Sequence, residues 1–170
     1  MSLISTLIGK DHLKRLVLLL SLCLTVSLIS ACGSLPYSKP SVNYSHRGNE
    51  IAQRALKYIG KPYRYGGHSP RGFDCSGLIY YVYGQFGYRL PRKTKDQVKV
   101  GRHVSRKNLS PGDLVFFKVN WKGSLHGGIF LGNGKFIHAP KTGKTVQVER
   151  LDRGYYKAKY HNARRVIPKG

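Results

Sequence analysis

The segment HGGIFLGNGKFIH, residues 126–138, predicts a β-hairpin. Two apolar runs flank a Gly-Asn-Gly tip at 132–134, and such tips are typical of tight turns between antiparallel strands. One histidine lies in each arm, at His126 and His138. Because side chains alternate between the two faces of a strand, the pairing register decides whether these histidines can meet.

Two turn lengths are compatible with this tip. A two-residue turn pairs Gly132 with Lys135 and places the two histidines on opposite faces. A three-residue loop pairs Leu131 with Lys135 and places them on one face. Such loops commonly end in a left-handed residue, which suits Gly134, so the sequence favours the three-residue loop. In that register one face carries His126, Gly128, Phe130, Phe136 and His138, and the other carries Ile129, Leu131 and Ile137.

The segments around the hairpin predict helices first and strands afterwards. Helical patterns cover residues 49–59, 74–86 and 93–100, and further strands are expected at 114–117, 145–151 and 163–168. The second helix has an apolar stripe formed by Leu78, Ile79, Val82 and Tyr83. Helices followed by antiparallel strands indicate an α+β fold, with the N-terminal helices packed on a five- to six-stranded sheet.

The N-terminal segment has the pattern of an exported lipoprotein. Basic residues precede an apolar run, 16–29, which ends in Ser30-Ala31-Cys32. This run is shorter than the roughly 20 residues that a membrane-spanning helix needs, which makes a permanent span the weaker interpretation. The small pair before Cys32 resembles a bacterial lipobox, in which the cysteine receives a lipid and becomes the mature N-terminus. Ordinary signal cleavage beside a chance cysteine is the alternative.

The expected organisation is a lipoprotein signal peptide over 1–31, a lipidated tether over 32–48 and one domain over 49–170. Acyl chains on Cys32, such as palmitate, would hold the protein stably on a membrane. Gly33 follows the cysteine instead of an aspartate, which favours the outer membrane in a bacterium with two membranes. The expected location is therefore the bacterial cell envelope, with the domain facing the periplasm.

The composition is strongly basic. Thirty Lys and Arg residues against seven Asp and Glu give a formal charge of +23, which implies an acidic partner. Nucleic acid is the usual partner of such a chain, but export argues against it and favours anionic cell wall or lipid head groups. The alternative is a solvated basic surface that only keeps the protein soluble.

Cys75 is the cysteine that export and lipidation leave unexplained. Of three cysteines, Cys23 falls in the removed segment and Cys32 takes the lipid, so the mature chain cannot form an internal disulfide. If Asp74 caps the second helix, Cys75 falls on its first turn, where unpaired N–H groups and the helix dipole stabilise a thiolate and an oxyanion. Cys75 is thus a candidate nucleophile, with a buried, inert cysteine as the alternative.

The three residues fit a catalytic triad. Cys75 would attack a carbonyl, His126 would take the thiol proton and return it to the leaving amine, and His138 would orient His126. Ordinary surface or core histidines are the bland alternative. A zinc site formed by the same three side chains is another, but it needs all three as ligands of one ion. We expect no metal and no cofactor.

Four segments in one order, 73–78, 109–117, 126–132 and 136–139, resemble the NlpC-type cell-wall cysteine peptidase family. The likeness covers about 50–168 and implies a papain-like fold with a permuted layout. It also implies Cys75 as nucleophile, His126 as base and His138 as the third polar member. The remaining family positions match Tyr63, whose hydroxyl would assist the oxyanion, and Asp74 and Ser76, which would shape the substrate site. Gly127 departs from the apolar residue found in many members.

The resemblance implies hydrolysis of the peptidoglycan stem peptide, at the γ-D-glutamyl–diaminopimelate bond or at crosslinks that involve diaminopimelate. Such substrates are rich in carboxylates, which suits the basic chain. The expected partners are stem peptides and, through Cys32, a membrane, but not nucleic acid, and the protein is expected to be a monomer. An acyltransferase on the same fold and a non-catalytic, basic wall-binding module are the alternatives.

Overall fold

The computed structural model describes residues 44–120 and 124–167, all within one compact unit that spans 41–170. The predicted signal peptide, Cys23 and Cys32 lie outside the described residues. The elements in chain order are α2 (Tyr44–Leu56), β1 (His68–Ser69), β2 (Gly72–Phe73), α3 (Cys75–Gly84), α4 (Thr94–Gln97), β3 (Arg102–His103), the 3₁₀ helix η1 (Arg106–Asn108), β4 (Leu114–Lys118), β5 (Leu125–Gly132), β6 (Lys135–His138), β7 (Gln147–Arg150), α5 (Gly154–Lys159) and β8 (Tyr160–Arg165).

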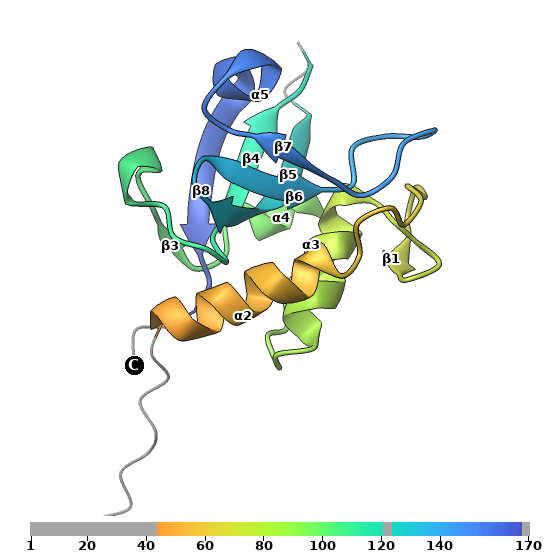
Figure 1. Cartoon of the computed structure of the whole chain (residues 1–170), viewed down its shortest axis with the longest axis horizontal. Helices are drawn as coiled ribbons and strands as arrows, with labels where there is room; N and C mark the ends of the chain where they lie inside the picture. The colour runs from red at the N-terminus through yellow and green to blue at the C-terminus, as the bar shows by residue number, and fades with distance from the viewer. Residues whose placement is uncertain (1–43, 121–123, 168–170) are drawn as a thin grey trace, which may run out of the picture. The chain divides into compact units, whose positions relative to one another are not determined.

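A six-stranded antiparallel sheet forms the centre of this unit, with strand order β3-β8-β4-β5-β6-β7. The helices α2 and α3 lie together beside this sheet, and α5 lies at its far end (Figure 1). A separate two-stranded ribbon, β1-β2, precedes α3. The predicted α+β class, with N-terminal helices on a five- to six-stranded antiparallel sheet, is confirmed.

Apolar side chains on the two faces of the sheet belong to two separate clusters. The helix-side cluster joins strand residues such as Phe116 and Ile137 to the predicted stripe of α3, all four of whose residues are fully buried. The second cluster contains Phe117 and Phe136, and Tyr156 of α5 packs against it. The alternation along β4 thus assigns neighbouring residues to opposite faces, as the pleat of a strand requires.

The hairpin tip combines features of both predicted turns. Asn133 and Gly134 have φ values of 51° and 68° and form a two-residue turn that pairs Gly132 with Lys135, so the predicted three-residue loop is wrong. The register then shifts between Phe130 and Gly132, which leaves Leu131 as the extra residue of a β-bulge.

Beyond the bulge, the pairing of the two arms follows the favoured register. Ile129 pairs with Ile137, and Phe130 pairs with Phe136. The predicted division of the faces is therefore confirmed, because Ile129 and Ile137 belong to the helix-side cluster while Phe130 and Phe136 belong to the second. The bulge supplies the one-residue offset that was expected from the loop.

Some predicted elements have other bounds. The first helix begins at Tyr44 and ends at Leu56, where 49–59 was predicted, so it takes in part of the predicted tether. A 2.8 Å ion pair between Arg47 and Glu50 stabilises the N-terminal part of this helix. Gly48 allows the helix to lie close to Pro111, because a Cβ at this position would collide with the Pro111 carbonyl. The third helix is a single turn, Thr94–Gln97. The ribbon β1-β2, the short strand β3 and α5 were not predicted, because each is too short to show an apolar period.

Candidate active site

Cys75 is the first residue of α3, and Asp74 caps the helix as predicted. The Oδ1 atom of Asp74 accepts a hydrogen bond of 2.6 Å from the backbone N–H of Gly77. Arg92 holds the same carboxylate with both terminal nitrogens, at 2.9 Å from Oδ1 and 2.7 Å from Oδ2. Burial alone would raise the pKa of Asp74, but the bonds from Arg92 and Gly77 and the charge of Arg92 outweigh it and lower that pKa. The carboxylate therefore stays charged and fixes the turn that carries the thiol.

The thiol of Cys75 lies in the wall of an open cleft of about 660 Å³. The hydroxyl of Thr94 lies within hydrogen-bond distance of the thiol, with 3.5 Å between Sγ and Oγ1. Cys75 is only partly buried, which argues against the inert, buried cysteine. Other walls of the cleft are formed by Tyr63, Tyr65, His68, Tyr80 and Lys93.

Tyr63 and Ser76 also lie in the cleft wall, where the resemblance placed supporting residues. Burial, followed by the neighbouring Cys75 and Asp74, raises the pKa of Tyr63, so its hydroxyl keeps its proton at neutral pH. The Ser76 hydroxyl donates to Asp74 at 3.1 Å and accepts from Arg92 at 3.0 Å. Ser76 therefore belongs to the network that supports the first turn of α3.

His126 and His138 form a buried pair on the sheet. Nε2 of His126 and Nδ1 of His138 are 2.7 Å apart, and the two rings pack among Phe117, Phe136 and Tyr156. Burial lowers the pKa of His126 to about 4. Burial, with the nearby charge of His126, lowers the pKa of His138 to about 2. Both rings are therefore neutral at neutral pH.

This hydrogen bond restricts how the protons of the pair are placed. Each neutral imidazole carries one N–H, so one ring donates and the other accepts. If His126 donates through Nε2, its Nδ1 has a free lone pair and is able to act as a base. His138 then carries its proton on Nε2, a buried atom without a partner among the described residues. Catalysis by His126 requires this arrangement, because the opposite one puts a proton on His126 Nδ1.

The structure brings together part of the predicted triad. The histidines meet each other, but among the hydrogen bonds of residues 44–120 and 124–167 none joins Cys75 to His126. The histidine pair packs with the second cluster, whereas α3 packs through the helix-side cluster. No group of His, Cys, Asp and Glu in the described ranges is arranged to hold a metal ion, so the zinc alternative gains no support from this geometry. The triad itself stays a prediction.

Sequence reasoning missed three polar side chains that surround the start of α3. Arg92, Thr94 and Gln97 come from the segment after α3 and bond to residues 74–76. Nothing in the local sequence around Arg92 or the single-turn helix α4 indicates a contact with the start of α3. That contact forms only because the chain folds back after α3.

The buried histidine pair predicts acid-sensitive stability. Both folded pKa values lie below the ordinary value of 6.5, so the unfolded chain binds protons that the folded chain excludes. The contribution of the two histidines to the free energy of unfolding is therefore fully present above pH 6.5. It is lost as the pH drops from 6.5 towards 4, by about 1.4 kcal/mol per pH unit for each histidine.

Urea unfolding between pH 7 and pH 5 measures this slope. We expect His138→Asn to remove about half of the histidine contribution. A slope that is the same in wild type and His138→Asn would contradict the burial of a neutral pair.

The comparisons with known proteins agree with this fold. The model of the NlpC/P60 family matches residues 60–165. Murein DD-endopeptidase MepH of Escherichia coli (strain K12) is 44% identical over 119 residues, which are 67% of this chain and 44% of that protein. Probable endopeptidase NlpC of the same strain is 37% identical over 148 residues, 84% of this chain and 96% of that protein.

Solved structures show the same relationship. The NlpC/p60 domain of peptidoglycan hydrolase SagA is 38% identical, with a TM-score of 0.61, and the match covers 69% of this chain and 97% of that one. An NlpC/P60 family protein from Bacillus cereus ATCC 10987 is 33% identical, with a TM-score of 0.68, over 71% of this chain and 40% of that one.

These matches confirm the papain-like α+β class that the resemblance implied. The chain belongs to the NlpC/P60 family. It spans less than half the length of several curated relatives that it matches, including MepH.

Proposed function

We propose that this protein is a peptidoglycan hydrolase, a cysteine endopeptidase that cleaves an amide bond of the stem peptide through a thioacyl-enzyme. The observation that carries the proposal is the position of Cys75, at the start of a capped helix and in the wall of an open cleft. The relatives named as murein endopeptidases support the choice of substrate.

In the attacking step, the thiol proton passes to Nδ1 of His126 and the sulfur of Cys75 bonds to the carbonyl carbon. The carbonyl oxygen becomes an oxyanion. Its donors would be the backbone N–H of Cys75, which has no acceptor among the described residues, and the hydroxyl of Tyr63. The step requires Cys75 and His126 to come within hydrogen-bond distance when substrate binds, since such bonds are often long in unliganded sites.

In the second half of the reaction, protonated His126 gives its proton to the leaving amine and the C–N bond breaks, which leaves a thioester on Cys75. His126 then takes a proton from water and the hydroxide attacks the thioester. As the C–S bond breaks, His126 returns that proton to the sulfur of Cys75, which releases a carboxylic acid and restores the thiol. His138 accepts the Nε2–H bond of His126 throughout and keeps its ring oriented.

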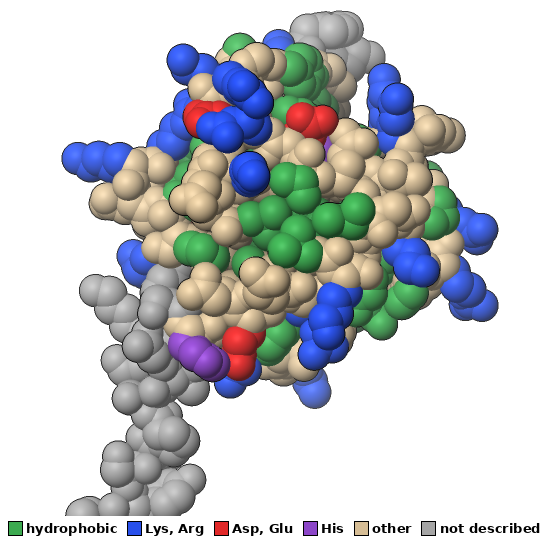
Figure 2. Space-filling view, in the orientation of Figure 1, with side chains coloured by type: hydrophobic (Ala, Val, Ile, Leu, Met, Phe, Trp, Pro, Cys, Tyr) green, Lys and Arg blue, Asp and Glu red, His purple; other side chains and the backbone are tan. Residues whose placement is uncertain are grey.

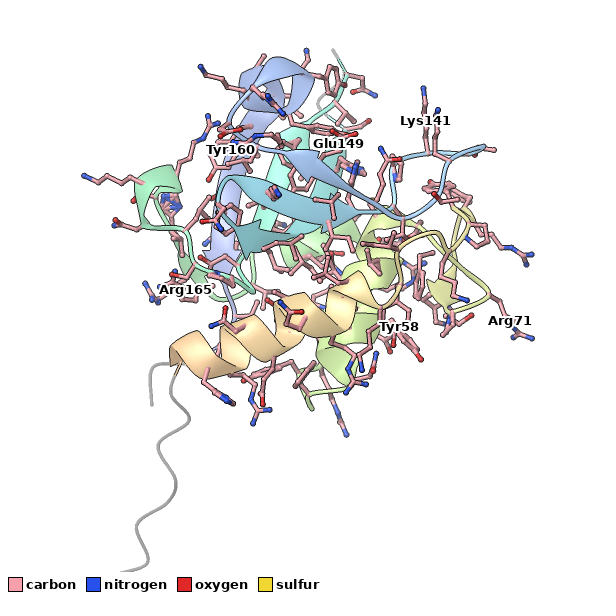
Figure 3. The ribbon with its side chains drawn as sticks, viewed as in Figure 1. Tyr58, Arg71, Lys141, Glu149, Tyr160 and Arg165 are labelled. Carbon is pink, nitrogen blue, oxygen red and sulfur yellow. The ribbon has the colours of Figure 1, made fainter. Side chains whose placement is uncertain are left out.

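The charged surface suits an anionic substrate. No lysine of the described residues takes part in an ion pair, and Lys93 stands at the cleft wall. Basic side chains outnumber acidic ones on the face that Figure 2 shows. Arg71, between β1 and β2, and Lys141, between β6 and β7, are exposed and point away from the domain (Figure 3). We infer that carboxylate-rich stem peptides, and not nucleic acid, are the partners.

Anchoring to a membrane is part of the proposal. Residues 1–31 would be the signal peptide, Cys32 would carry the lipid, and the residues before α2 would tether a monomeric domain to the outer membrane. No helix in the described ranges is long and apolar enough to cross a membrane. The mass of the mature N-terminal peptide checks the lipid.

The function is tested by digesting isolated sacculi with the mature, detergent-solubilised protein and identifying the released fragments by mass spectrometry. We expect diaminopimelate-containing peptides with a new carboxyl end, and none after the thiol of Cys75 has been blocked with iodoacetamide. Fragments joined to an added amine would instead indicate an acyltransferase. Binding to sacculi with no release by the untreated protein would indicate a wall-binding module.

A further inference from the structure

One segment of the chain, residues 92–97, contacts three consecutive residues, 74–76, at the start of α3. Arg92 bonds to the carboxylate of residue 74 and to the hydroxyl of residue 76. Thr94 approaches the thiol of residue 75, and Gln97 bonds to the backbone carbonyl of residue 76. Cys75 therefore lies between two residues, Asp74 and Ser76, whose positions are fixed by hydrogen bonds. This fixes the position of the thiol relative to Thr94.

Gln97 is the deepest part of this segment. Its side chain is fully buried, and Nε2 donates to the carbonyls of Ser76 at 3.0 Å and Pro91 at 2.8 Å. Both amide hydrogens are thus in use, whereas Oε1 is buried without a partner among the described residues. A buried polar atom without a partner costs free energy, so Oε1 does not stabilise the fold. The Gln97 side chain stabilises the fold through its two hydrogen bonds to the carbonyls of Ser76 and Pro91. Gln97 joins the start of α3 to the residue that precedes Arg92.

Thr94 presents its hydroxyl to the cleft. Its backbone is fixed, because Thr94 begins α4 and its carbonyl accepts from the N–H of Val98 at 3.1 Å. Cys75 Sγ, at 3.5 Å, is the only hydrogen-bond partner of Oγ1 among the described residues. A hydroxyl in this place is able to donate to a thiolate, and bonds to a charged acceptor are stronger than neutral ones.

We propose that Thr94 is a catalytic residue that donates a hydrogen bond to the Cys75 thiolate, and that Gln97 is the positioning residue that holds it there. The inference rests on the proposed function only in that Cys75 is the nucleophile. Thr94 keeps its proton throughout, while the thiol proton goes to His126. As the C–S bond forms, the sulfur loses its charge and the Thr94 bond weakens. Thr94 therefore favours formation of the nucleophile.

Other titratable groups also face the thiol and must stay constant in any test. Tyr63, Asp74 and Arg92 are electrostatic neighbours of the site, and the other titratable side chains that line the same cleft are Tyr65, His68, Tyr80 and Lys93. None of them is altered by a substitution at Thr94. A change in thiol reactivity in a Thr94 variant can then be assigned to the hydroxyl.

The test measures the rate at which iodoacetamide alkylates Cys75 as a function of pH, by intact-protein mass spectrometry. Thr94→Val keeps the shape of the side chain but removes the donor, and we expect the midpoint of the curve to rise by about one pH unit. Thr94→Ser keeps the donor and should leave the midpoint in place, as should Thr145→Val on an exposed side chain. The same midpoint in Thr94→Val and wild type would overturn the proposal.

Gln97→Met tests the positioning role, because methionine fills a similar volume without donors. We expect its midpoint to rise in the wild-type background and to stay unchanged in the Thr94→Val background, since the donor is already absent there. Equal shifts in both backgrounds would show a general structural effect and refute the positioning role. If Gln97→Met does not fold, the Thr94 variants alone decide. Alkylation needs no peptidoglycan, so failure to digest sacculi would leave this result standing.

Discussion

Cys75→Ala is expected to lower the release of peptides from sacculi by at least about 10⁴-fold, because no thioacyl intermediate forms without the sulfur. The substitution removes a partly buried atom and leaves the Asp74 cap intact, so the fold and the binding to sacculi should persist. Soluble fragments that contain diaminopimelate are measured against wild type at equal protein concentration.

The control for this experiment is Cys75→Ser, which keeps the size of the side chain but offers a much weaker nucleophile. It should also be nearly inactive, and the thermal unfolding of both variants should match wild type. Equal release by wild type and Cys75→Ala would rule out a thiol mechanism. Loss of sacculus binding together with activity would point to a damaged cleft instead.

His126→Ala is expected to reduce kcat by about 10²- to 10⁴-fold, the range usually lost with a general acid–base group. The substitution removes the atom that takes the thiol proton and the donor of the proton to the leaving amine. KM should change little, because the assigned role of His126 is proton transfer in the transition state and not the binding of the substrate. Steady-state kinetics on a purified stem peptide separate the two parameters.

His138 provides the comparison within the same pair. His138→Ala should reduce kcat less than His126→Ala, and His138→Asn should lose least, because an amide can still accept the Nε2–H bond of His126. A larger loss in His138→Ala than in His126→Ala would contradict the assigned order of roles and make His138 the base. Unfolding curves at neutral pH identify any variant whose loss comes from instability.

Strong local patterns in the sequence predicted the main elements of the fold. The stripe of α3 is visible at a spacing of three and four residues, and the arms of the hairpin alternate strictly. The bulge at Leu131 was not visible, because it depends on the neighbouring chain: Phe130 exchanges backbone hydrogen bonds with Gly112 and Asp113, at 2.9 and 2.8 Å. α5 was missed because six residues are too few to show an apolar period, and its Tyr156 packs against the second cluster.

The candidate site, like the fold, could be predicted only where it depends on neighbouring residues of the sequence. Asp74 and Cys75 are adjacent, so their cap and helix position followed from local rules. The polar contacts from Arg92, Thr94 and Gln97 come from residues about twenty positions later in the chain, and no local pattern reports them. Whether His126 and His138 meet depends only on whether the register places them on the same face. The hairpin signal left two possible registers, and one of them does so.

The bulge at Leu131 also determines how this hairpin can vary in length during evolution. Tips of hairpins ordinarily accept insertions and deletions because little depends on them. Here, losing Leu131 alone would abolish the bulge but keep Phe130 opposite Phe136, so both histidines would stay on one face. Losing the bulge while Leu131 is kept would instead shift one arm by one residue, and one histidine would turn towards the side on which the helices pack. A change of one residue at the tip therefore keeps both histidines on the same face only if the bulge is gained or lost with it. A hairpin that is one residue shorter at this tip should therefore also lack the bulge.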